Sequence, residues 1–155
     1  MTHDMQKVSS ELYEQDFNLW IHENVEHLTH GDFKNCDMNN IIEELKSMGN
    51  SELNELESRL ITLLGHLLKY KYQPIHRSSG WRGTIRHNRI KINGLLRKSP
   101  SLKNKFIDLL NDDYVKRNAI GIFTDETGLN ANILSLQPEF TLEQILDDEF
   151  LPGYL

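Results

Sequence analysis

Hydrophobic side chains recur along most of the chain at intervals of three and four residues, the spacing of an amphipathic α-helix. The pattern covers residues 11–30, 38–72, 79–96 and 100–127, and a shorter stretch follows Thr141. No segment shows the strict alternation of a half-buried strand. Because each helix has one apolar stripe that another helix must cover, the sequence predicts an all-α fold, a helical bundle of four main helices plus a short C-terminal helix.

Several residues mark where these helices begin, bend or end. Ser99 followed by Pro100 is typical of a helix start, and Gly128 suits the position just after a helix. Thr141 with Gln144 three residues later is the signature of a capping box. In the long second helix, Gly49–Asn50 predicts a bend or a short break.

Length and composition favour a single helical domain over residues 1–155, with residues 1–9 forming a flexible N-terminus. One cysteine, Cys36, forms no internal disulfide. The most apolar stretch, residues 60–68, is too short to span a membrane, and the first ten residues lack the apolar core of a signal peptide. We therefore expect a cytoplasmic protein without membrane contact, and the sequence indicates no cofactor and no metal.

Charge is distributed unevenly along the chain. The net charge is −6, yet residues 58–107 contain no Asp or Glu and twelve Lys and Arg. Cations neutralise phosphates and aromatic rings stack on bases, so the basic segment, residues 69–98, has the chemistry of a nucleic-acid surface. Its candidate binding residues are Lys69, Lys71, Arg77, Arg82, Arg86 and Arg89.

The same cations have a structural interpretation, in which they face carboxylates of the domain itself. Glu43 to Glu57 on the second helix and Asp147–Glu149 near the C-terminus are suitable partners. The low isoelectric point, about 5.6, also differs from that of a typical nucleic-acid module. We favour the structural interpretation and keep nucleic-acid binding or RNA processing as an alternative.

His66 lies within an apolar run and is a second candidate site. A histidine there is either a core residue with one satisfied hydrogen bond or a poised acid or base. A hydrolase built on His66 and a carboxylate is therefore a second alternative. Gly65 beside it indicates that another helix approaches closely, and we expect Trp20, Trp81 and His66 to be largely buried.

Several short motifs, in this order and spacing, resemble a bacterial domain-of-unknown-function family, number twenty-nine. The motifs that carry the resemblance are Tyr13 with Asp16, Phe17 and Trp20; Ile42-Glu43-Glu44; His66-Leu67-Leu68-Lys69; Tyr72-Gln73-Pro74; Ser79 with Trp81, Ile85 and Arg89; Ser99-Pro100-Ser101-Leu102; and Phe150-Leu151-Pro152. The resemblance implies an all-helical domain and implies no activity. The prediction for function is accordingly a small protein-interaction module rather than an enzyme, whose partner is another protein or a second copy of the chain.

Overall fold

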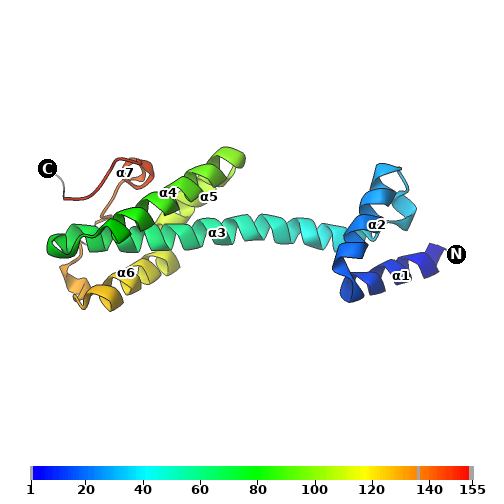
Figure 1. Cartoon of the computed structure of the whole chain (residues 1–155), viewed down its shortest axis with the longest axis horizontal. Coiled ribbons are helices and arrows are strands. Elements are labelled where there is room, and N and C mark those ends of the chain that lie inside the picture. Colours follow the sequence, from blue (N-terminus) through cyan, green and yellow to red (C-terminus); the bar gives the residue numbers. More distant parts are fainter. Residues whose placement is uncertain (1, 136, 154–155) are drawn as a thin grey trace. The chain divides into compact units, whose positions relative to one another are not determined.

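The computed structural model describes the backbone of residues 2–135 and 137–153, and their side chains from Ser9 onward. Within these ranges there is no strand, which confirms the all-α prediction. The α-helices (Figure 1) are α1 (Thr2–Gln15), α2 (Phe17–Thr29), α3 (Met38–Tyr72), α4 (Ser79–Lys98), α5 (Leu102–Asn111), α6 (Asp113–Thr127) and α7 (Leu142–Leu146). Three 3-10 turns connect them: η1 (Phe33–Asn35), η2 (Pro74–His76) and η3 (Ala131–Ile133).

Two of the four predicted main helices are each divided by an aspartate. Asp16 leaves the helical conformation and its carboxylate accepts a hydrogen bond from the Leu19 N–H, which starts α2. Asp112 does the same for the Tyr114 and Val115 N–H groups and starts α6. An aspartate at an N-cap satisfies N–H groups that have no partner within the helix. The prediction of four main helices was therefore wrong in number, although not in class.

The predicted helix ends are confirmed in some places and not in others. Thr141 and Gln144 form the reciprocal capping box, and Gly128 ends α6 with a φ of +71°. Ser99, by contrast, caps the end of α4, so Pro100 lies in the turn before α5. Helix α3 continues through Gly49–Asn50, so the predicted break there is absent. A single glycine costs a helix only about 1 kcal/mol, which the neighbouring helical residues outweigh.

The contacts between residues divide the chain into two compact units, Met1–Ser51 and Glu52–Leu155. The N-terminal unit holds α1, α2, η1 and the first part of α3, and the C-terminal unit holds the rest of the chain. Helix α1 begins at Thr2, so residues 2–9 are helical here. The single domain with a flexible stretch at residues 1–9 stays a prediction, which unfolding measurements can test.

The N-terminal unit is organised around Trp20, which is 3% exposed. Its indole N–H donates to the Asp37 carboxylate at 3.0 Å, and the Asn24 side chain accepts from the Asp37 backbone N–H. The rings of Tyr13 and Phe17 lie 4.9 and 5.5 Å from the Trp20 ring. These contacts confirm the prediction that Trp20 is buried, and they give its N–H a partner.

The C-terminal unit contains a continuous hydrophobic core. Figure 1 shows α4, α5 and α6 around the later part of α3. Leu56, Leu60, Leu63 and Leu67 of α3 are completely buried. A Cβ atom on Gly65 would lie 2.8 Å from Ile122, which confirms that another helix, α6, approaches closely at this point.

Trp81 and His66 are less completely buried than Trp20, but both are more buried than exposed, which agrees with the prediction that they are largely buried. Trp81 packs against the hydrophobic core, and the Lys69 ammonium lies over its ring. All helices in the part of the chain that the structure describes are too short or too polar to cross a lipid bilayer.

Candidate functional site

Two of the six predicted cations of the basic segment are held by carboxylates of the C-terminal unit. The Lys69 ammonium, almost completely buried, binds Glu126 of α6 and lies 4.4 Å from the centre of the Trp81 ring. The Lys71 ammonium lies 2.5 Å from a carboxylate oxygen of Glu139, and this hydrogen bond raises the pKa of Lys71. Both lysines have partners from segments far away in the sequence.

Two arginines bind backbone carbonyl groups and so hold the C-terminal segment on the bundle. Arg89 is 1% exposed, and its guanidinium donates to the carbonyls of Gln144, Ile145 and Phe150 at 2.7–2.9 Å. Arg77 donates to the carbonyls of Tyr70 and Pro152. Burial lowers the pKa of Arg89, while the neighbouring charges of Asp147 and Asp148 raise it.

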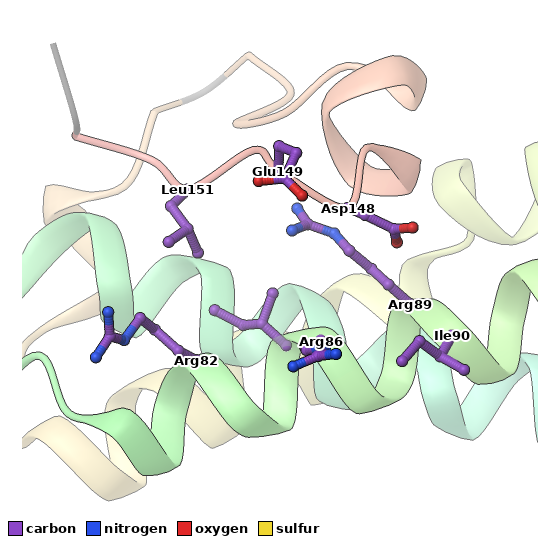
Figure 2. Close-up of a pocket in the computed structure, with 8 residues that line it drawn as sticks. Arg82, Arg86, Arg89, Ile90, Asp148, Glu149 and Leu151 are labelled. Carbon is purple, nitrogen blue, oxygen red and sulfur yellow. The ribbon is translucent and has the colours of Figure 1, made fainter.

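Arg82 and Arg86 are the two exposed arginines of the predicted set. With Arg89 they line an open cavity of about 550 Å³, whose other wall includes Asp148 and Glu149 (Figure 2). Figure 2 shows Arg89 reaching from α4 to the C-terminal segment, whereas Arg82 lies away from the two carboxylates. Neither Arg82 nor Arg86 forms a side-chain hydrogen bond or ion pair with the described residues.

The structure thus brings together three of the predicted site residues, the arginines of α4, and directs the others to separate internal partners. Of the acidic residues predicted as partners, Asp148 and Glu149 line the same cavity, but the buried guanidinium of Arg89 binds backbone oxygens instead. Cations elsewhere in the basic stretch follow the predicted pairing more closely. Lys98 binds Glu52 at 2.7 Å, and Arg59 lies 3.6 Å from Glu55.

His66 is placed as a structural residue by its contacts. Its Nδ1 lies 2.9 Å from the Thr62 carbonyl, one helical turn earlier. Burial lowers the pKa of His66, and the hydrogen bond to Thr62 opposes this shift. Within the described residues no carboxylate forms a hydrogen bond with the ring, and the nearby Glu126 is bound to Lys69. In the part of the chain that the structure describes, His66 therefore has no acidic partner for acid–base catalysis.

The N-terminal unit carries a surface that the sequence analysis did not identify. Two rows of hydrophobic side chains, here called the apolar stripes, remain 39–66% exposed. The α2 stripe is Phe17, Ile21, Val25 and Leu28, and the α3 stripe is Met38, Ile42, Leu45 and Met48. Periodicity alone assigns such rows to a core, because it cannot tell which helix faces find a partner within the chain.

The match to known proteins concerns family membership only. No curated protein and no solved structure matches the chain. The family model described as domain of unknown function DUF29 matches residues 12–151, nearly the whole chain. This match confirms the resemblance seen in the sequence motifs, and the chain belongs to the DUF29 family.

Proposed function

We propose that this chain is a protein-interaction module that binds its partner through the apolar stripes of the N-terminal unit. The observation that carries the proposal is the number of large hydrophobic side chains left exposed on one small unit. Of the large hydrophobic residues that are exposed, Phe17, Leu19, Ile21, Val25, Leu28, Phe33, Met38, Ile42, Leu45 and Met48 all belong to residues 1–51.

The size of this surface supports the proposal. The exposed fractions of the ten side chains together equal about five whole side chains. At about 150–200 Å² for each large side chain, they present on the order of 900 Å² of apolar area. The largest apolar patch of a typical monomer is about 300–600 Å², and a stable interface buries about 800 Å² on each partner. The stripes, together with Leu19 and Phe33, therefore expose about as much apolar area as one side of a specific interface buries.

The charge of the N-terminal unit indicates which partner fits. Residues 1–51 contain ten Asp and Glu and three Lys and Arg. Two copies of this unit would repel one another, whereas a protein with a basic surface would be attracted. Self-association remains a candidate, but the charge favours a different, basic partner protein.

Nucleic-acid binding receives less support from the same structure. Four of the six candidate residues, Lys69, Lys71, Arg77 and Arg89, are engaged in internal contacts, which leaves Arg82 and Arg86. Two arginines facing a cavity that also contains carboxylates would bind a polyphosphate chain weakly. Salt-sensitive binding of a fluorescent oligonucleotide by the folded protein, abolished in an Arg82→Ala, Arg86→Ala variant, would reverse this preference.

The test compares a variant of the stripes with a matched control. The stripe variant carries Ile21→Gln, Val25→Gln and Leu45→Gln, and the control carries Ile75→Gln, Ile90→Gln and Ile133→Gln, which alter exposed residues of the C-terminal unit. Sedimentation measures self-association, and crosslinking in the native cell after nuclease treatment measures other partners. We expect only the stripe variant to lose its complexes. If the stripe variant forms the same complexes as the control, and in the same amounts, the proposal is contradicted.

A further inference from the structure

We propose that the C-terminal unit binds a single-chain amphiphile, an apolar chain with a carboxylate head, in a second cavity. This cavity has a volume of about 440 Å³ and lies among α3, α5, α6, α7 and the segment that precedes α7. It is separate from the arginine-lined cavity, and the inference does not rest on the proposed interaction through the N-terminal unit.

The walls of the cavity are suited to an apolar chain. The walls include Leu64 and Leu68 of α3, Leu110 of α5, Ile120 of α6, Phe140, and Leu142 of α7. These side chains belong to the hydrophobic core or pack against it, so the cavity is an open extension of the core. Ligand sites of about 300–1,000 Å³ with mainly apolar walls and few polar groups are typical for small molecules.

One of the two charged residues on the walls is already neutralised. The Glu139 carboxylate accepts hydrogen bonds from the Lys71 ammonium, the Tyr72 hydroxyl and the Ser135 backbone N–H. Burial raises the pKa of Glu139. The hydrogen bonds that its carboxylate accepts, above all the one from Lys71, outweigh this effect, so the pKa is lowered overall. Glu139 therefore stays ionised and paired, and it offers little to a ligand.

Lys116 is the remaining charge, and it determines the sign of the ligand. Its side chain is exposed on the first turn of α6 and forms no hydrogen bond or ion pair with any described residue. Asp112, one turn earlier, directs its carboxylate to the N–H groups of Tyr114 and Val115 instead. An ammonium at the rim of an apolar cavity selects an anion whose apolar part enters the cavity.

The experiment titrates the full chain with decanoate, decanol and decylamine at concentrations where they are monomeric. Amide chemical shifts in ¹⁵N spectra locate the site, and calorimetry gives the affinities. We expect shifts that saturate at residues 110–120, 134–135 and 137–145, with affinity decreasing from decanoate to decanol to decylamine. Binding of decylamine as tight as that of decanoate, or no saturable shifts in these segments, would overturn the proposal.

Two variants separate the charge from the cavity. Lys116→Gln should lower the affinity for decanoate by up to about fivefold, the effect of one exposed ion pair, and leave the affinity for decanol unchanged. Lys103→Gln, which alters another exposed lysine, is the matched control and should change neither. Leu134→Trp, at a half-buried wall position, should reduce the affinity for both probes, with circular dichroism confirming the fold. Equal weakening by Lys116→Gln and Lys103→Gln would contradict the assigned head group.

Membrane lipids also combine apolar chains with anionic head groups, so a further experiment distinguishes a membrane from a free amphiphile. Vesicles of phosphatidylglycerol present acyl chains and anionic heads together, whereas the cavity accepts one free chain. If monomeric decanoate binds saturably, and vesicles displace it only at high lipid concentration, the ligand is a free amphiphile, as proposed. Binding to vesicles without any binding of decanoate would overturn it.

Discussion

At the scale of single residues, Arg89 shows how a buried cation can be stabilised without a carboxylate. Gln144 and Ile145 lie in the last turn of α7, where carbonyl groups have no helical N–H partner. A guanidinium has five N–H donors in one plane, so one side chain can bind several such oxygens together. Arg89 therefore satisfies the end of α7 and fixes the chain that follows it.

Replacing Arg89 by alanine should destabilise the C-terminal unit by about 3–5 kcal/mol, because one buried and two partly buried carbonyls lose a charged donor. Each such hydrogen bond contributes about 1.5–3 kcal/mol, and water can replace part of the loss at the two partly buried carbonyls. Arg89→Lys should recover only part of this loss, since an ammonium cannot match the planar arrangement of donors. The exposed Arg86→Ala is the control and should lie within about 0.5 kcal/mol of the wild type. Urea unfolding followed by circular dichroism measures all three. Equal midpoints for Arg89→Ala and Arg86→Ala would show that Arg89 is not a structural clamp.

His66 should make the stability of the C-terminal unit depend on pH. Burial lowers its pKa in the folded state below the ordinary value of 6.5, with Lys69 adding to the shift and Glu126 opposing it. As the pH falls through about 6.5, the unfolded chain takes up the proton first, so the free energy of unfolding decreases until the folded pKa is reached. His66→Gln should remove this decrease, and the exposed His87→Gln should retain it. Unfolding curves from pH 7.5 to 5 test this expectation. If the free energy of unfolding decreases equally in the wild type and in both variants, groups other than His66 cause the decrease.

How far the sequence predicts a residue's role depends on what that residue binds. The capping box of Thr141 and Gln144 follows from the sequence, because both partners are three positions apart. The role of Arg89 does not, because backbone carbonyls are the same in every sequence and the fold alone brings them near. The sequence identifies Lys69 and Lys71 as candidate binding cations. It does not identify their partners, because Glu126 and Glu139 belong to distant segments.

At the scale of the helices, the contact between α3 and α6 depends on the absence of a side chain at Gly65. A Cβ atom there would lie 2.8 Å from two carbon atoms of Ile122 and 3.3 Å from the carbonyl oxygen of Ala119. The first distance is too short for carbon atoms, and the second involves rigid backbone. The two helices would have to separate to admit even a methyl group.

Gly65→Ala should therefore destabilise the protein by about 1–3 kcal/mol, the range for overpacking a core, despite the better helix propensity of alanine. Gly83→Ala on α4, where a Cβ would meet no atom within 4 Å, should instead stabilise the same unit by up to about 1 kcal/mol. Thermal unfolding measures both. Adding Ile122→Ala to Gly65→Ala should restore part of the loss, and the absence of any such coupling would contradict the assigned contact.

The helices also show what periodicity does and does not reveal. The apolar pattern correctly indicates where the chain is helical. It continues across Asp16 and Asp112, however, because a helix that restarts after one residue can keep nearly the same buried face. The polar residue at the cap is the available signal, and an aspartate within a helix has the same appearance in the sequence.

At the scale of the whole molecule, the uneven charge of the sequence becomes a difference between the two units. Residues 1–51 hold ten of the 23 Asp and Glu and only three of the 17 Lys and Arg. The C-terminal unit uses many of its cations to bind its own carboxylates and carbonyls. The N-terminal unit has few cations for such pairing, and its surface combines excess acids with exposed apolar side chains. The apolar stripes could not be predicted because the sequence does not show which stripe is covered.

The two units should differ in stability, because the continuous core of buried hydrophobic side chains lies in the C-terminal unit. Each unit contains one tryptophan, Trp20 or Trp81, which allows each to be followed separately. In Trp81→Phe the fluorescence of Trp20 reports the unaltered N-terminal unit, and in Trp20→Phe that of Trp81 reports the unaltered C-terminal unit. We expect the Trp20 transition at a lower urea concentration, since less buried apolar area opposes unfolding there. Coincident transitions, matched by circular dichroism, would instead support the single cooperative domain that the sequence predicts. A partner that covers the stripes should raise the midpoint of the Trp20 transition, because ligands that bind only the folded state stabilise it.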